Sequence, residues 1–299
     1  MLKFPAFLSR FARRTLFGLS TAGVICTAIA PVTAEAQSGS AALDAALRAE
    51  VALVYDLDNG TRIYEKNSDE LRPIASITKL MTALVVIESG LPLDEVLTIS
   101  SDDIDRMRHS RSRLPVGTRL TRGEMLHLAL MSSENRAANA LGRHYPGGLP
   151  AFVRAMNDKA RALGMRHSRF VEPTGLSSDN VATSHDLVKL VHATDSHPRL
   201  RFYATDDTEV FDLGRGRQLT YNNTNRLVRR SDWDIRVSKT GFINEAGQCL
   251  VMLTRIDNRD LAIVLLNADA RSARVGDANR LRQLVEAGSP TLALAGSGS

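Results

Sequence analysis

The spacing of hydrophobic positions divides the chain into three regions. Near the N-terminus, two short runs rich in β-branched and aromatic residues, 51–56 and 61–65, are joined through Asn59-Gly60. This pair readily adopts the positive φ angles of a tight turn, so we predict a β-hairpin here. From Ser76 onward the apolar positions change to helical spacing, which predicts a helix.

Helical periodicity continues through the middle of the chain. Thr121 and Glu124 have the spacing of a capping box and predict the start of a helix. Further helices are expected at residues 136–142, 150–163 and 184–194. Strand character returns near the C-terminus, followed by one amphipathic segment; the expected strands are 235–239, 248–256 and 261–267, and the expected helix is 274–287.

This order of elements predicts an α+β fold. Early and late strands, at about 50–66 and 235–268, share one antiparallel sheet flanked by N- and C-terminal helices. The intervening residues, about 80–230, form an inserted helical lobe. We expect one domain over residues 37–288, with its site in a cleft between sheet and lobe.

Residues 1–36 have the features of a secretory signal peptide. A cationic stretch is followed by an apolar run and by small residues that end at Ala36, after which we predict cleavage. The apolar run is shorter than the roughly 20 residues of a membrane span, so a membrane anchor is the less favoured interpretation. We therefore expect a periplasmic protein. Residues 289–299, rich in small residues, are expected to be disordered.

Composition and charge exclude several classes of protein. With 43% hydrophobic and 24% charged residues, the chain is typical of a globular protein. Its net charge of +5 comes mainly from the leader, where four basic residues face one acid, so the near-neutral remainder gives no reason to expect nucleic-acid binding. A basic cluster at 106–113 follows several acids and lacks aromatic residues that would stack on bases. Cys249 has no partner outside the leader, and no metal-binding motif occurs, so we expect no metal or cofactor.

Ser76 and Lys79 form an S-x-x-K motif at the start of a predicted helix. The i, i+3 spacing places hydroxyl and amine on one face, with Cβ atoms about 5–6 Å apart. Only six of the 38 basic residues are lysines, and a lysine, unlike an arginine, can lose its proton when buried. The motif therefore indicates a serine activated by an amine.

Ser133 and Asn135 lie in a turn after an apolar helix. The serine hydroxyl is able to relay a proton, and the asparagine amide is able to bind a peptide carbonyl. On its own this S-x-N tripeptide is more typical of an ordinary loop between two helices.

The motif Lys239-Thr240-Gly241 ends a predicted strand and leads into Phe242. A cation and a hydroxyl at a strand end suit a substrate carboxylate. Gly241 lacks the Cβ that would keep a substrate backbone away. The backbone N–H of Phe242 is expected to pair with that of Ser76 as an oxyanion hole.

The three motifs in this order resemble those of low-molecular-mass penicillin-binding proteins, the serine D-alanyl-D-alanine peptidases, and most closely the endopeptidase subgroup. The similar segments are residues 73–81, 130–137, 170–176 and 238–251. The resemblance implies a β-lactamase/DD-peptidase-like fold, peptidoglycan stem peptides as substrate, β-lactams as covalent inhibitors, and cleavage of D-alanyl cross-links.

The resemblance also implies a role for each motif residue. Ser76 would be the acylated nucleophile and Lys79 its base, with Ser133 passing a proton between the lysine and the leaving group. Asn135 would hold the acyl-side peptide. The remaining residues would bind the terminal carboxylate or form the oxyanion hole: Lys239, Thr240, Gly241 and Phe242.

Three alternatives remain open. A D-alanyl-D-alanine carboxypeptidase would trim pentapeptide stems with the same residues. A serine β-lactamase would need a second base, for which Glu172 is the candidate, and a non-catalytic protein would only bind peptidoglycan. The larger carboxypeptidases carry a second β domain and an amphipathic C-terminal anchor; since about a dozen residues follow the last expected helix, we expect no stable membrane anchor.

Overall fold

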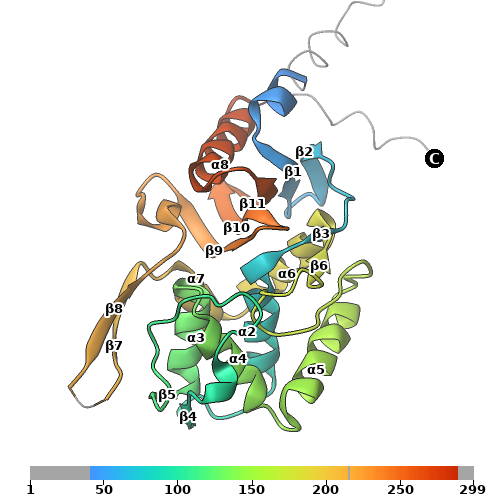
Figure 1. Ribbon diagram of the computed structural model, residues 1–299. Helices are drawn as coiled ribbons and strands as arrows, with labels where there is room; N and C mark the ends of the chain where they lie inside the picture. The colour runs from blue at the N-terminus through green and yellow to red at the C-terminus, as the bar shows by residue number, and fades with distance from the viewer. Residues whose placement is uncertain (1–40, 215, 289–299) are drawn as a thin grey trace, which may run out of the picture.

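A five-stranded antiparallel sheet unites the first and last thirds of the chain in the computed structural model, which describes residues 41–214 and 216–288 (Figure 1). The strand order is β2-β1-β11-β10-β9, so β1 pairs with β11 across some 200 residues of sequence. The strands are β1 (Ala49–Asp56), β2 (Thr61–Lys66), β9 (Asp234–Ile243), β10 (Gly247–Ile256) and β11 (Arg259–Ala268). The predicted sharing of one sheet by early and late strands is confirmed.

The hairpin β1–β2 also forms as predicted. Asp56 pairs with Thr61, and Gly60 takes a φ of 67° in the turn. At the opposite edge of the sheet, β9 has a partner strand on one side only, which leaves its other side facing the helical lobe.

In the described part of the chain, the helical lobe contains six α-helices, which lie below the sheet in Figure 1. The helices are α2 (Thr78–Glu88), α3 (Arg122–Met131), α4 (Asn135–Arg143), α5 (Gly148–Ala162), α6 (Ser184–Asp195) and α7 (Pro198–Thr205). The predicted capping box is present at the start of α3. Glu124 N donates to Thr121 Oγ1 at 3.2 Å, and Thr121 N donates to the Glu124 carboxylate at 2.7 Å.

Both faces of the sheet are covered, which explains the nearly continuous apolar sequence of β10. Val251 and Leu253 belong to the core shared with the lobe. Leu250 and Met252 point the other way, into a second core formed with α8 (Arg271–Glu286). Because successive side chains of a strand alternate between faces, a strand covered on both faces is apolar throughout.

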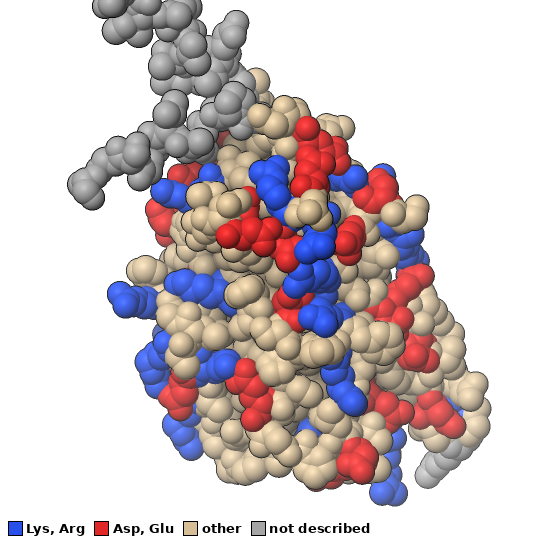
Figure 2. Space-filling view, turned by 180° about the vertical axis from the view of Figure 1, so that it is seen from behind, with Lys and Arg blue, Asp and Glu red and all other residues tan. Residues whose placement is uncertain are grey.

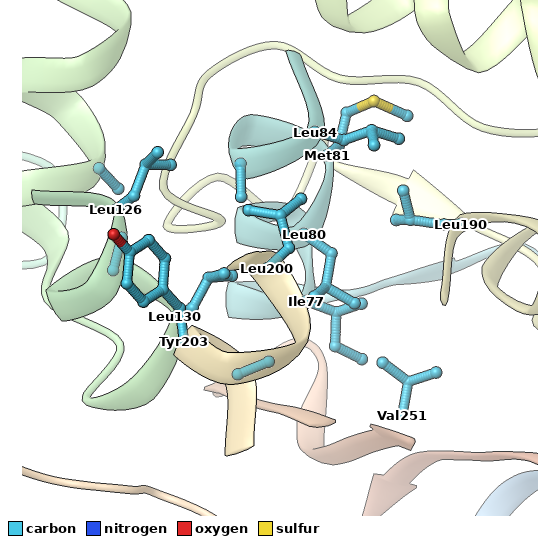
Figure 3. Packing of buried hydrophobic residues seen from close by; sticks show 14 of the residues in the cluster. Ile77, Leu80, Met81, Leu84, Leu126, Leu130, Leu190, Leu200, Tyr203 and Val251 are labelled. Atoms are coloured by element: carbon cyan, nitrogen blue, oxygen red, sulfur yellow. The ribbon is translucent and has the colours of Figure 1, made fainter. Parts of the chain in front are cut away.

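Helix α2 is enclosed by its neighbours. Nine of its eleven residues are buried, and Figure 3 shows Leu80, Met81 and Leu84 packed among side chains of the surrounding elements. Ile77, just before the helix, lies near Val251 of β10 (Figure 3). Burying such side chains contributes about 2 kcal/mol each, so this packing holds the start of α2 firmly in place.

Several elements differ from the sequence predictions. Ser76 lies in a 3₁₀ turn, η1 (Ala75–Ile77), and α2 begins two residues later than expected. Helix α7 was not predicted, nor were the short strands of the lobe. These strands are β3 (Arg72–Pro73), β4 (Val96–Thr98), β5 (Arg119–Thr121), β6 (Val181–Ala182), β7 (Thr208–Asp212) and β8 (Gln218–Asn222).

The surface seen in Figure 2 carries acidic and basic side chains interleaved, in keeping with the small net charge. Among residues 41–214 and 216–288, none of the helices has the length and apolarity required to cross a bilayer. The predicted signal peptide, residues 1–36, and the predicted tail, residues 289–299, lie outside the described residues.

Candidate active site

Ser76 stands where the sheet meets the helical lobe, in the 3₁₀ turn that leads into α2. The residue before it, Ala75, has a φ of 47°, a left-handed conformation that costs an alanine about 1–2 kcal/mol. Gly175 of a neighbouring loop packs against this turn, and a Cβ at Gly175 would lie 1.9 Å from the Ala75 carbonyl oxygen. The serine is therefore held in a strained turn that tight packing keeps in place.

Lys79 lies one helical turn after Ser76 and is fully buried. Its Nζ is 2.9 Å from Ser76 Oγ, 2.7 Å from Asn135 Oδ1 and 2.6 Å from the carbonyl oxygen of Thr174. The last two partners are acceptors only, so each takes a hydrogen from the amine. In a neutral amine, the lone pair is then directed towards the hydroxyl of Ser76.

Asn135 is the first residue of α4 and is tied to two other residues of the site. Its Nδ2 donates to Ser110 Oγ at 2.9 Å, which fixes the amide with its oxygen towards Lys79. The sequence predicted an amide free to bind a peptide carbonyl. In the structure both ends of the amide are already hydrogen-bonded: its oxygen accepts from Lys79 and its nitrogen donates to Ser110.

Ser133 occupies the turn between α3 and α4 with a φ of 63°. Its Oγ accepts a hydrogen bond of 2.9 Å from the Nζ of Lys239, which comes from β9. Because the hydroxyl accepts a hydrogen bond from the Lys239 amine, its own hydrogen is available to another group. Strained conformations of this kind persist where the surrounding structure enforces them, and they are common in active sites.

The Lys239-Thr240-Gly241 motif lies on β9, the sheet edge that faces the lobe. Lys239 is buried, and Thr240 Oγ1 donates to Thr224 Oγ1 at 2.7 Å. A Cβ at Gly241 would lie 3.0 Å from Ser76 N and 2.9 Å from the carbonyl oxygen of Ile74. The glycine thus allows β9 to pack against the turn that carries Ser76, whereas the sequence had suggested that it makes room for a substrate.

Burial lowers the pKa of both site lysines. The pKa of Lys79 falls from 10.5 to about 8 because of burial, and the nearby carboxylates of Glu172 and Glu134 oppose this shift. The pKa of Lys239 falls well below its usual value, first because of burial and then because of the positive charges of Lys79 and Arg274. Burial is thus the main cause of the lowered pKa of Lys79, as expected from the sequence for a buried lysine.

A cleft of about 1270 Å³ opens over these residues. Six of the eight predicted site residues line it, and the two lysines lie buried beneath them. The lining six are Ser76, Ser133, Asn135, Thr240, Gly241 and Phe242. Phe242 and Met107, which are 54% and 60% exposed, give the rim an apolar part. The structure therefore brings all eight predicted residues to one place.

Glu172 does not line the cleft and anchors its own loop instead. Its carboxylate accepts hydrogen bonds from the backbone N–H groups of Thr174 and Gly175, at 2.6 and 2.7 Å, and from Asn180 Nδ2 at 2.7 Å. This loop supplies the Thr174 carbonyl that contacts Lys79. Glu172 is thus a positioning residue, and the sequence had marked it only as a candidate second base within the family-like segment 170–176.

Arg274 is a second site residue that the sequence did not indicate. It is buried on α8 and lines the cleft, with its guanidinium 2.9 Å from Gln248 Oε1 and 3.5 Å from the Gly241 carbonyl oxygen. Burial, followed by the charge of Arg271, lowers its pKa to about 10. The side chain remains charged at neutral pH and places a positive charge beneath the cleft.

A group of three side chains within the described residues is able to hold a metal ion, but it lies outside the cleft lining. Ligand atoms of His127, Asp206 and Glu209 lie within 4.8 Å of one another. The imidazole stacks on Tyr203 with ring centroids 4.6 Å apart, and its Nε2 is 2.8 Å from Asp206 Oδ2. This arrangement connects α3 to the segment between α7 and β7.

Comparison with known proteins agrees with the geometry of the site. The sequence profile of the peptidase S11 family, described as D-alanyl-D-alanine carboxypeptidase, matches residues 35–270. The chain belongs to this family. The resemblance to serine D-alanyl-D-alanine peptidases, inferred from the three motifs, is therefore confirmed.

Relatives within the S11 family include two named endopeptidases. The D-alanyl-D-alanine endopeptidase of Pseudomonas aeruginosa is 48% identical over 241 residues, which cover 80% of this chain and 78% of that protein. The D-alanyl-D-alanine endopeptidase of Escherichia coli is 44% identical over 263 residues, which cover 86% of this chain and 85% of that protein.

Solved S11-like structures share the fold. The Streptomyces K15 DD-transpeptidase superimposes with a TM-score of 0.75 and 27% identity, covering 81% of this chain and 98% of that one. Penicillin-binding protein D2 of Listeria monocytogenes in its cefotaxime-bound form gives a TM-score of 0.71 and 29% identity. The match covers 80% of this chain and 97% of that one. The predicted α+β, DD-peptidase-like fold is confirmed.

Proposed function

We propose that this S11 peptidase hydrolyses D-alanyl bonds in peptidoglycan stem peptides, with cross-links as the preferred substrate, through an acyl-enzyme on Ser76. The observation that carries the proposal is the contact between Lys79 and Ser76. A buried amine has two acceptor-only partners and lies 2.9 Å from the serine hydroxyl, which suits removal of its proton.

Acylation begins with attack of Ser76 Oγ on the carbonyl carbon of the D-alanyl bond, while the hydroxyl proton passes to Lys79 Nζ. The developing oxyanion is stabilised by the backbone N–H groups of Ser76 and Phe242. A donor of this kind is commonly worth about 3 kcal/mol. The edge position of β9 supports this role, because backbone groups on its outer side lack a partner strand.

Breakdown of the tetrahedral intermediate requires a proton on the leaving nitrogen. Ser133 is placed to donate its hydroxyl proton, since its oxygen accepts a hydrogen bond from Lys239. The proton that Lys79 took from Ser76 then passes to Ser133 Oγ, so that Ser133 is restored and Lys79 is neutral again. The carbon–nitrogen bond breaks, the amine leaves, and Ser76 retains the acyl group. Water then attacks the ester with Lys79 as base, which regenerates the serine and releases the acid.

The carboxylate next to the scissile bond is bound by the cationic end of the cleft. Thr240 offers a hydroxyl at the surface, the Lys239 amine offers a hydrogen-bond donor, and Arg274 supplies positive charge beneath them. Hydrogen bonds to a charged partner in such a site are worth about 1.5–3 kcal/mol each. Asn135 contributes by positioning Lys79 and Ser110, with the acyl-side peptide passing beside it.

A carboxypeptidase that releases terminal D-alanine is the second candidate, because it breaks the same type of bond and relatives carry both names. A β-lactamase is disfavoured, because Glu172 is occupied by its own loop and does not reach the cleft lining. An intact Ser76–Lys79 pair argues against a protein that only binds peptidoglycan.

We further propose that the protein acts in the periplasm after removal of residues 1–36, as the leader sequence predicts, with residues 37–288 as the peptidase domain. Substrate and β-lactams are both extracytoplasmic ligands, which is consistent with export. Fractionation of cells that express the tagged protein, followed by N-terminal sequencing, tests location and cleavage after Ala36 together.

Labelled penicillin and muropeptide chromatography test the proposed activity. The purified protein is expected to bind fluorescent penicillin covalently, and Ser76→Ala is expected to abolish the label. Digestion of purified peptidoglycan is expected to remove cross-linked dimers. Conversion of pentapeptide monomers alone would instead identify a carboxypeptidase, and absence of label would refute the acyl-enzyme.

A further inference from the structure

The walls of the cleft carry charge of one sign. Within residues 41–214 and 216–288, the cleft lining contains five arginines and neither aspartate nor glutamate. The face drawn in Figure 2, in contrast, mixes both signs. The arginines of the lining are Arg108, Arg226, Arg229, Arg271 and Arg274. A cleft of this composition attracts a ligand with more than one negative charge.

Two of the five arginines are available to such a ligand. Arg108 pairs with Glu245 at 2.8 Å, Arg229 pairs with Asp207, and Arg274 is buried. Arg226 and Arg271 are exposed, and neither forms an ion pair with a carboxylate of the described residues. An exposed cation without a protein partner keeps its full capacity to bind an anion.

Both available arginines lie next to the pocket for the terminal carboxylate. Arg271 precedes Arg274 by three residues on α8, so the two share one side of the helix, and the charge of Arg271 lowers the pKa of Arg274. Arg226 follows a segment that is bonded to β9 through Thr224 and Thr240. The two side chains therefore border the cleft from α8 and from the segment beside β9.

We propose that Arg271 and Arg226 form a second anion subsite, beyond the pocket for the terminal carboxylate, that binds a carboxylate on the leaving half of a cross-linked stem-peptide dimer. This inference rests on the proposed function. Trimming of a pentapeptide releases one D-alanine, whose single carboxylate is bound by the first pocket. Cleavage of a cross-link instead releases a second acidic stem peptide. Only this leaving group has carboxylates in addition to the one bound by the first pocket, and these can reach a second subsite.

The test compares Arg271→Gln, Arg226→Gln and the double variant on a purified cross-linked muropeptide dimer and on a pentapeptide monomer. The measured quantity is kcat/KM for the dimer divided by kcat/KM for the pentapeptide. We expect this ratio to fall about threefold in each single variant and about tenfold in the double variant, which is the size of effect expected for ion pairs in contact with solvent. Raising the salt concentration should lower dimer cleavage by the wild type more than by the double variant.

Arg154→Gln is the matched control, since Arg154 is an exposed arginine on α5, outside the cleft lining. It should leave the ratio unchanged. An unchanged ratio in the double variant, or an equal fall for both substrates, would overturn the subsite. Fluorescent penicillin is applied to every sample, because a wild type without label would refute the acyl-enzyme itself, whereas a labelled double variant that cuts dimers at full rate refutes only the subsite.

Discussion

The amine of Lys79 lies 2.6 Å from the carbonyl oxygen of Thr174, a residue 95 positions away in the sequence. This contact gives the amine a fixed orientation, because a carbonyl only accepts hydrogen bonds. Together with the Asn135 oxygen it leaves one direction for the lone pair, and Ser76 lies in that direction. The base is thus oriented by backbone and amide groups that do not change their charge with pH.

The rate of acylation should rise with pH and reach half of its maximum near pH 8. The reason is that burial lowers the pKa of Lys79 to about 8, and only the neutral amine accepts the serine proton. Below this value the rate should fall about tenfold per pH unit. Stopped-flow measurement of β-lactam acylation between pH 5 and 10 tests this, and a flat profile would contradict the assignment of Lys79 as base.

Replacing Lys79 by arginine should reduce acylation by about 10²- to 10⁴-fold, because arginine keeps its proton under all working conditions. The variant retains positive charge, so loss of charge does not explain the effect. Lys159→Arg is the control, since Lys159 forms an ion pair with Glu88 on the lobe surface. If Lys79→Arg were acylated at a rate close to that of the wild type, a different group would be the base.

Glu172→Gln should shift the acid limb of the acylation profile to lower pH. The carboxylate of Glu172 raises the pKa of Lys79, so its removal should lower that pKa below about 8. The melting temperature should also fall, because the amide group of glutamine faces N–H donors that the carboxylate accepted. Glu286→Gln, on the exposed side of α8, serves as the control.

Release of the acyl group from the Glu172→Gln variant separates the peptidase from a β-lactamase. The hydrolysis rate of the β-lactam acyl-enzyme should change little, since Glu172 does not line the cleft. A large fall in that rate, with acylation preserved, would indicate a water-activating base and would support the β-lactamase alternative.

Gly175→Ala should destabilise the fold by more than about 2 kcal/mol and suppress acylation. Its φ is 82°, and the added Cβ would collide with the peptide group that carries Ser76. Gly117→Ala is the matched control, since its φ is 89° with no atom within 4 Å of the new Cβ. Urea unfolding should show a cost of about 1 kcal/mol for the control, and equal costs would mean that the close approach is unimportant.

Sequence patterns were sufficient to predict the sheet, most of the helices and the three motifs. Each of these features depends on local spacing or on residues of unusual chemistry. Runs of β-branched and aromatic residues joined through Asn59-Gly60 marked the hairpin β1–β2, and the capping box marked α3. The scarcity of lysine pointed to Lys79. These predictions hold because the local conformational preferences of these segments agree with the tertiary structure.

Features that depend on long-range packing were not predictable. The 3₁₀ turn at Ser76 follows from the close approach of Gly175 and Gly241, which no local pattern encodes. Arg274 resembles other helix arginines in sequence, and only its burial behind β9 brings it to the site. Likewise, the carbonyl of Thr174 is a backbone group, so side-chain motifs carry no information about it.

The three buried basic side chains beneath the cleft, Lys79, Lys239 and Arg274, also affect the stability of the fold. Folding withdraws them from water, and no carboxylate lies among the residues that line the cleft above them in the described parts of the chain. An anionic ligand supplies the missing negative charge and binds only the folded state, so it favours folding by mass action. The peptidase should therefore resist unfolding best when an anionic ligand occupies its cleft.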